Sequence, residues 1–87
     1  MLDELVGSKI IVDLSSPYVC LGTLQGFSEH FLQVRNADLH DLRDTDTTRE
    51  NYIFEAQRTG IKRNRKKVLI VRSEIVAITL FEDLVDS

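Results

Sequence analysis

One short segment restricts the fold of this chain more than any other: Gly22-Thr23-Leu24-Gln25-Gly26-Phe27. It lies between two runs of alternating apolar residues. Glycine inside a strand marks a bulge, a sharp bend or a close approach of two backbones. A strongly bent strand near the start of an 87-residue chain predicts a small closed barrel and not an open sheet. Small barrels often bind oligonucleotides or peptides and seldom act as enzymes.

Alternation of apolar and polar residues predicts five strands. Ile10, Val12 and Leu14 share one face of a segment that is typical of a half-buried strand. Similar patterns, separated by turn residues, predict strands over residues 9–14, 18–27, 30–38, 67–71 and 74–81. Arg72-Ser73 is short enough to join the last two strands as a β-hairpin.

The chain is expected to begin with a short helix over residues 1–7, which ends at Gly7. With this helix and five strands, the fold class is expected to be mainly β. A single domain is expected over residues 1–87, with an insert over approximately 39–64 between the third and fourth strands.

The insert is expected to contain a second helix, over residues 48–59. Thr47-x-x-Glu50 has the form of a capping box, and Gly60 can end a helix. The segment Tyr52-Ile53-Phe54 is also typical of a strand, so the strand remains an alternative for this region.

Composition narrows the class of protein. Cys20 is the only cysteine, and with Leu24 it is expected on the inward face of its strand, which fits a buried thiol and a cytoplasmic location. No apolar run is long enough to span a bilayer, and the N-terminus does not have the form of a secretory signal. Small domains without a disulfide or a metal are often stabilised by oligomerisation.

Charge is distributed unevenly in a chain whose net charge is −3. Six of the eleven basic residues fall between positions 62 and 72, where no acidic residue occurs. This asymmetry predicts an anionic partner on one face. The alternative is a solvated connector followed by charges that protect a strand from aggregation.

No enzyme or metal site is expected. Cys20 and His30 could form a nucleophile and base, but no third group is placed to orient the base. One acidic segment resembles a metal cluster but lacks the spacing of a calcium loop, and is better interpreted as an acidic loop; it contains Asp38, His40, Asp41, Asp44 and Asp46. No cofactor is expected either.

In their order and spacing these patterns resemble the Sm/LSm family. The first family motif resembles Ile10-x-Val12-x-Leu14 followed by Cys20-x-Gly22-x-Leu24-x-x-Phe27, and the second resembles Val68-Leu69-Ile70 followed by Ile75-Val76-x-Ile78. The resemblance covers most of the chain except roughly residues 39–64, and is that of a divergent member of bacterial or phage type. It implies an N-terminal helix, a strongly bent five-stranded SH3-like barrel and assembly into rings.

The resemblance also implies a uridine pocket, built from an acidic residue, a base-stacking residue and an asparagine of the first motif, and closed by an Arg-Gly pair of the second. Aligned without a gap, Ser28, His30 and Leu32 stand at the first three positions, and Leu32 cannot hydrogen-bond a base edge. Arg72-Ser73 stands in place of Arg-Gly, and serine can block the close approach of a flat base.

A turn one residue longer brings Glu29, Phe31 and Gln33 to the same three positions. Phe31 can stack on a base, and Gln33 can hydrogen-bond a base edge. We favour this register because it keeps Leu32 and Val34 on the inward face. The alternative for Phe31 is that it packs against the inserted helix and that its polar neighbours are solvated.

The predicted function is a homo-oligomeric ring that binds single-stranded RNA without catalysis. The candidate RNA-binding residues are Glu29, His30, Phe31, Gln33, Arg72 and Ser73, together with Lys62, Arg63, Arg65, Lys66 and Lys67 for phosphates. One alternative is a ring that has lost the RNA pocket and serves as a scaffold for protein–protein interaction. A weaker alternative is a monomeric SH3-like barrel that binds peptides.

Self-assembly is expected through the strands over 66–71 and 74–81. Residues 75–81 carry no charge, and an edge strand this apolar would aggregate unless a neighbouring subunit paired with it. The other expected partners are single-stranded RNA or protein, and no membrane.

Overall fold

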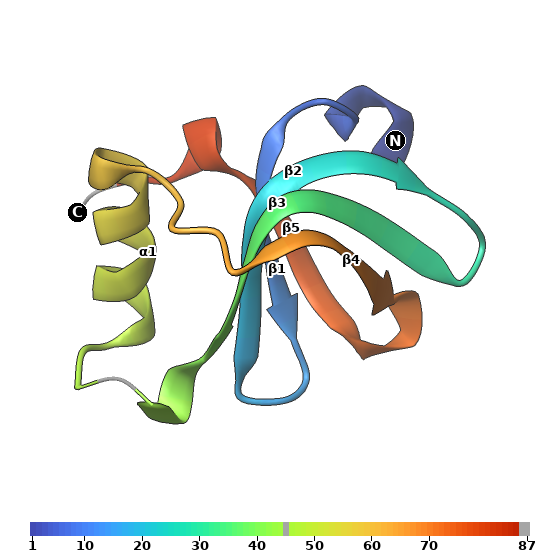
Figure 1. The fold of residues 1–87 in the computed structure, drawn as a ribbon. Coiled ribbons are helices and arrows are strands. Elements are labelled where there is room, and N and C mark those ends of the chain that lie inside the picture. The colour runs from blue at the N-terminus through green and yellow to red at the C-terminus, as the bar shows by residue number, and fades with distance from the viewer. Residues whose placement is uncertain (45, 86–87) are drawn as a thin grey trace.

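A strongly curved antiparallel sheet forms the body of the protein in the computed structural model, which describes residues 1–44 and 46–85 (Figure 1). Five strands in the spatial order β4-β3-β2-β1-β5 make up this sheet. The mainly β class is therefore confirmed. The strands are β1 (Lys9–Leu14), β2 (Tyr18–Phe27), β3 (Phe31–Asp41), β4 (Arg65–Val71) and β5 (Ile75–Leu80).

β4 and β5 follow one another in the chain but lie at opposite edges of the described sheet. The 3-10 helix η3 (Arg72–Glu74) joins them, and β5 pairs with β1 through Ile10↔Leu80 and Val12↔Ile78. The expected β-hairpin is therefore wrong. The barrel is open because β4 and β5 do not pair with each other, and each leaves one edge unpaired. Because η3 carries the chain from one edge of the sheet to the other, the apolar faces of β4 and β5 both pack on one core.

The inner face of the curved sheet holds the main core. Cys20 and Leu24 of β2 are fully buried there, as their position in the alternation predicts. The other buried members are Ile10, Val12, Leu32, Val34, Ala37 and Ile70. Leu2 and Leu5 close one end of this core from the 3-10 helix η1 (Leu2–Leu5), which is shorter than the helix expected over 1–7. Chain direction changes there because Gly7 has a φ of 91°.

Gly22 marks the bend of the sheet, as the sequence predicts. Leu21 pairs with Asp38 and Thr23 with Arg35, so the single residue Gly22 faces two residues of β3 in a bulge. A Cβ atom on Gly22 would lie 2.5 Å from Val34 Cγ1, closer than side chains can approach. Glycine is therefore required at this point for β2 and β3 to approach each other.

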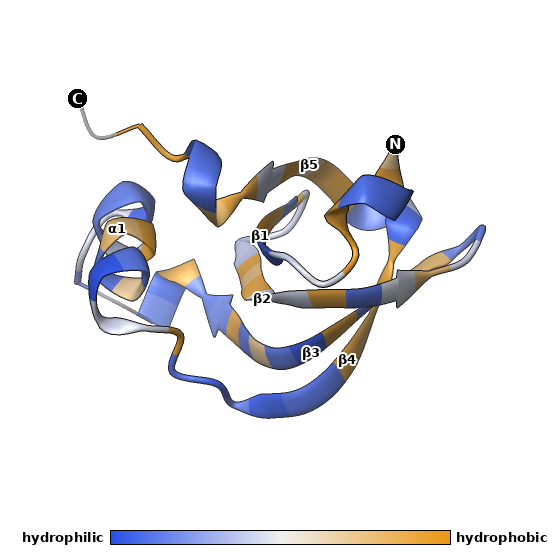
Figure 2. Cartoon of the chain, turned by 90° about the horizontal axis from the view of Figure 1, so that it is seen from above, coloured by the Kyte–Doolittle hydropathy of each residue, from blue (hydrophilic) through white to orange (hydrophobic). Residues whose placement is uncertain are grey.

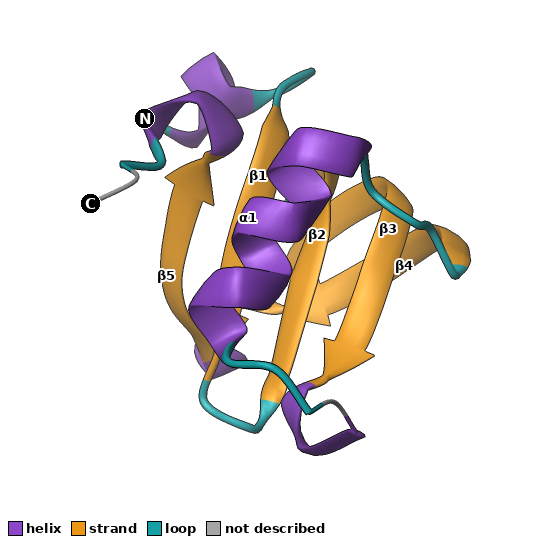
Figure 3. Cartoon of the chain, turned by 90° about the vertical axis from the view of Figure 1, so that its left-hand side faces the viewer, coloured by secondary structure: helices purple, strands orange, loops and turns teal. Residues whose placement is uncertain are grey.

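The inserted helix α1 (Arg49–Thr59) packs on the outer face of the sheet, in front of β1 and β2 in Figure 3. Its buried residues Ile53 and Ala56 join a second core with Ile11 of β1; the other buried members are Val19, Leu21 and Phe81. β1 is consequently buried on both faces, and the expectation of a half-buried strand is wrong. The 3-10 helix η4 (Phe81–Asp83) carries Phe81 into this core.

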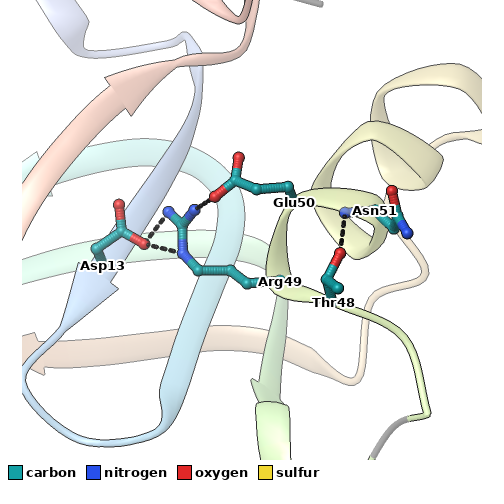
Figure 4. A network of polar contacts seen from close by, with 5 residues as sticks. All are labelled: Asp13, Thr48, Arg49, Glu50 and Asn51. Carbon is teal, nitrogen blue, oxygen red and sulfur yellow. Dashed lines mark hydrogen bonds and ion pairs between the residues drawn. The ribbon is translucent and has the colours of Figure 1, made fainter.

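The ends of α1 are fixed by caps. Thr48 Oγ1 accepts a hydrogen bond from the Asn51 backbone N–H at 3.1 Å, so the N-cap lies one residue after the expected Thr47 (Figure 4). Glu50 pairs with Arg49 instead of forming a capping box, and Arg49 Nε donates to Asp13 Oδ1 at 2.8 Å. The helix is confirmed, and the strand alternative for this segment is wrong.

The insert itself is shorter than expected. β3 continues to Asp41, which pairs with Tyr18, so the chain leaves the sheet only at the 3-10 helix η2 (Leu42–Asp44). It returns at Arg65, two residues before the expected start of the fourth strand. The insert therefore starts later than expected, after Asp41, whereas its end at residue 64 is as expected. Strand pairing continues through polar residues whose sequence suggested a loop.

Candidate nucleic-acid interface

The acidic segment of the sequence does not form a loop at Asp38, which is a buried residue of β3 with 8% of its surface exposed. Its carboxylate accepts hydrogen bonds from the Tyr52 hydroxyl of α1 and from Asn64 Nδ2, the latter at 3.2 Å. The Tyr52 ring also stacks on His40 at a centroid distance of 4.1 Å. Burial next to this carboxylate raises the pKa of Tyr52 above its usual range. These contacts anchor the insert to β3.

Asp41 of that acidic segment is engaged locally. Asp41 pairs with Arg43 at 2.8 Å, and hydrogen bonds from Arg43 hold the pKa of the Asp41 carboxyl below its usual value. Within residues 1–44 and 46–85, no group of three or more His, Cys, Asp or Glu side chains is placed to hold a metal ion. Cys20 is buried in the inner core, and burial raises the pKa of its thiol to about 12, so it is not an activated nucleophile.

The turn between β2 and β3 is in contact with the start of the connection from β4 to β5. The Arg72 backbone N–H donates to the His30 carbonyl at 2.8 Å, and Arg72 Nη1 donates to the Ser28 carbonyl at 2.6 Å. Phe31 pairs with Val71 in the β3–β4 ladder. The structure thus brings together the candidate residues of the first motif and Arg72 of the second.

β3 has the alternation on which the favoured register depends. Leu32 and Val34 are fully buried, whereas Phe31 is 41% exposed. Gln33 lies on the same outer face, and its Nε2 donates to Gln25 Oε1 at 2.9 Å. β3 begins at Phe31, and the β2–β3 turn that precedes this strand lies on the side of the sheet remote from α1 (Figure 1), so the alternative in which Phe31 packs against the inserted helix is wrong.

A hollow of about 300 Å³ lies against this end of the sheet. It is lined by Gly26, Phe27, Ser28, Phe31, Gln33 and Leu69. Gln33 keeps one amide N–H and its carbonyl oxygen for a further partner, because its recorded hydrogen bond uses one donor. An exposed ring beside an amide is the pair of groups needed to stack on a base and to hydrogen-bond its edge.

The remaining candidate RNA-binding residues near the hollow lie in the β2–β3 turn and in η3. Glu29 and His30 are exposed in the turn, and Ser73 is exposed within η3. The structure brings these residues near Phe31 and Arg72 in the fold, because the β2–β3 turn and η3 are joined by the two hydrogen bonds of Arg72.

The basic segment occupies the opposite end of β4. Lys62 and Arg63 precede the strand, and its first three residues, Arg65, Lys66 and Lys67, are exposed. Figure 2 shows β4 hydrophilic along its first part and hydrophobic along its second. The candidate residues therefore fall into two groups, separated along β4 by roughly 15–20 Å at a rise of about 3.3 Å per residue.

Sequence reasoning missed Leu69 as part of the hollow, Gln25 as the hydrogen-bond partner of Gln33, and Arg35. Arg35 lies two residues beyond Gln33 on the same outer face of β3 and is directly across from Lys67 of β4. Strand alternation was the signal that could have found it, because residues 31, 33 and 35 of a strand share a face.

These features define a small, strongly bent β-barrel with an open edge on each side and a hollow at one end. No protein-family model matches the sequence, and no curated protein matches it by sequence. By structure, the chain is similar to the Sm protein of Pyrococcus abyssi solved in complex with a uridine heptamer, with a TM-score of 0.63 and 15% identity over 91% of this chain and 90% of that one.

It is also similar to the Sm-like protein AF-Sm2 of Archaeoglobus fulgidus, with a TM-score of 0.62 and 17% identity over 92% of this chain and 88% of that one. The chain therefore has the Sm fold, as the order of its motifs predicts. None of the helices in the described residues is long and apolar enough to cross a membrane.

Proposed function

We propose that this chain assembles as a homo-oligomeric ring and binds single-stranded RNA without catalysis. The observation that carries the proposal is the contact between Arg72 and the Ser28–His30 turn, because it holds a guanidinium next to Ser28, which lines the hollow together with Phe31 and Gln33. A protein of the same fold has been solved with a uridine heptamer, which supports RNA as the ligand.

In this proposal each residue of the hollow has a separate task. Phe31 stacks on the face of a base, and the free amide groups of Gln33 pair with the base edge. Arg72 supplies a positive charge beside the turn, where its guanidinium is held by the Ser28 carbonyl and keeps further donors for a phosphate or base oxygen. No proton transfer or bond cleavage is required of any of them.

Ring assembly is supported by the two unpaired edges. β5 carries no charge, and Val76 is 70% exposed. If β4 of one subunit pairs antiparallel with β5 of the next, Lys66 near the start of β4 lies toward the acidic residues Glu82 and Asp83 that follow β5. Opposite charges on paired strands stabilise the pairing and set its register. The two edges differ, so each interface joins unlike surfaces.

Native mass spectrometry at low micromolar concentration tests the ring. We expect a closed set of five to eight copies, the range that the Sm resemblance implies, and we expect Ala77→Pro to abolish it because proline disrupts strand pairing. Val76→Lys is a second variant, which keeps the β5 backbone and places a like charge opposite β4. Circular dichroism checks that both variants still fold. A folded Val76→Lys variant with unchanged native mass would contradict edge pairing.

Fluorescence anisotropy with labelled decauridylate tests the ligand. Phe31→Ala is expected to weaken binding by roughly tenfold, since stacking on an aromatic ring contributes about 1–3 kcal/mol per base. If the wild-type ring forms but binds no RNA at moderate salt, the scaffold function replaces this proposal. Ser73 stands where the second Sm/LSm motif has glycine, and this difference favours the scaffold function.

A further inference from the structure

The outer face of β3 and β4 carries an ordered series of exposed or half-buried side chains that begins at the hollow. Cross-strand partners along it are Phe31 with Val71, Gln33 with Leu69, and Arg35 with Lys67. The series runs from an aromatic and apolar pair, through an amide, to a pair of cations. Arg63 lies beyond them, with Nη1 donating to Asn36 Oδ1 at 2.6 Å.

The cations of this region differ from those elsewhere in the fold. Arg43, Arg49 and Arg58 each form an ion pair with a carboxylate. Within the part of the chain that the structure describes, no ion pair involves any of seven other basic residues on or beside β3 and β4: Arg35, Lys62, Arg63, Arg65, Lys66, Lys67 and Arg72. Where these form recorded side-chain bonds, the acceptors are neutral oxygens of Ser28, Asn36 and Asn64.

Arg35 and Lys67 are directly opposite each other, and both are exposed. Like charges at directly opposed positions of an antiparallel pair destabilise the sheet. An anion bound between them removes this repulsion. The pair is therefore a place where the isolated subunit is less stable than it would be with a phosphate bound.

We propose that the outer face of β3 and β4 is a track for the backbone of single-stranded RNA that leaves the hollow, with Arg35 and Lys67 as its first phosphate contacts. This proposal rests on the proposed function for the base at Phe31. Phe31 and Arg35 are four residues apart, or about 13 Å along the strand. The track then continues to the basic residues Arg63 and Arg65 at the start of β4.

The track and the hollow predict different effects of substitution. In this proposal Arg35 contacts phosphates only. Arg35→Gln should therefore weaken the binding of decauridylate and of decaadenylate by the same factor, roughly threefold or more, and leave the ratio of the two affinities unchanged. It should also reduce the slope of log affinity against log salt by about 0.7 for each occupied subunit. Phe31→Ala should lower affinity without changing this slope.

Arg58→Gln is the matched control, because it removes the same charge from the exposed face of α1. Both oligonucleotides are titrated by anisotropy from 50 to 400 mM KCl with wild type and all three variants. Thermal unfolding gives an independent readout: Arg35→Gln should unfold at the same or a slightly higher temperature, because it relieves the repulsion with Lys67. Weaker RNA binding without loss of stability supports the track.

A salt slope for Arg35→Gln equal to that of Arg58→Gln would overturn the track, and it would leave the hollow intact if Phe31→Ala still weakens binding. If Phe31→Ala binds RNA as tightly as wild type while Arg35→Gln reduces the salt slope, the base site at Phe31 would be wrong, and Arg35 would remain a phosphate contact of RNA that does not pass through the hollow. Loss of all RNA binding in wild type would overturn both. A ten-residue glutamate peptide is also tested as a competitor of labelled decauridylate. If the peptide competes as strongly as unlabelled decaadenylate does, the face binds an acidic protein segment instead of RNA.

Discussion

The outer face of the sheet has two halves that the bend at Gly22 separates. The covered half lies under α1 and presents Ile11 and Leu21, with the buried carboxylate of Asp38. The open half presents Phe31, Gln33 and Arg35 to solvent on the same face of the same sheet. One strand, β3, contributes to both halves, so its sequence must suit a buried core at one end and an exposed surface at the other.

The two halves handle polar groups differently. On the covered half, Asp38 is saturated by Tyr52 and Asn64, as a buried carboxylate must be. On the open half, the cation Arg35 forms no ion pair within the described residues. Satisfied polar groups stabilise a fold, whereas unsatisfied exposed ones remain available to a ligand. The comparison indicates that stability and binding are assigned to different ends of one face.

The difference between the two halves is tested most directly by truncating one apolar side chain on each half. Ile53→Ala, on the side of α1 that packs on the covered half, should lower the free energy of unfolding by about 2–5 kcal/mol, because Ile53 is fully buried. Leu69→Ala, on the open half, should change it by about 0.5 kcal/mol or less, because Leu69 is 55% exposed. Urea unfolding at one protein concentration measures both. Equal losses would show that the open half is also part of the core.

The boundary between the halves is tested by its glycines. Gly22→Ala should lower the free energy of unfolding by about 1–3 kcal/mol, because the added Cβ meets Val34 and the Arg35 carbonyl. Gly26→Ala is the control, since no atom lies within 4 Å of its added Cβ. Thermal unfolding separates the two variants. A tolerated Gly22→Ala would show that the bend does not depend on the close approach at this point.

The polar contacts of the two halves give the smallest expected difference. Tyr52→Phe should lower the free energy of unfolding by about 1–2 kcal/mol, because Asp38 loses one donor and keeps Asn64. Gln25→Ala removes the partner of Gln33 on the exposed side and should change stability by about 0.5 kcal/mol or less. Chemical denaturation of both proteins in parallel checks this. A larger loss for Gln25→Ala would contradict the division of roles.

Local patterns were sufficient to predict the strands, the helix α1 and the bend. Alternation identifies Cys20 and Leu24 as inward residues, and Gly22 as the point of close approach, because these properties depend on neighbours in the chain or on the partner strand. The order of the patterns also pointed to the Sm fold, which the structural comparisons show.

What could not be predicted depends on contacts between distant segments. Burial of Ile11 requires α1 to fold back on β1, and the apolar run Ile10-Ile11-Val12 does not indicate which distant segment covers it. The burial of Asp38 could not be predicted because its two donors, Tyr52 and Asn64, are 14 and 26 residues away. Arg72 and Ser28, which meet at the candidate site, are separated by 44 residues. The role of each depends on the tertiary fold.

The shortness of η3 has a consequence for the energetics of the proposed assembly. Its three residues span the whole distance between β4 and β5, and its first residue holds the turn beside the hollow. If contact between subunits shifts either edge strand, the shift reaches Arg72, because only three residues connect β4 to β5. Thermodynamic reciprocity then requires that a ligand bound at Arg72 changes the affinity between subunits by the same factor as subunit contact changes the affinity for that ligand.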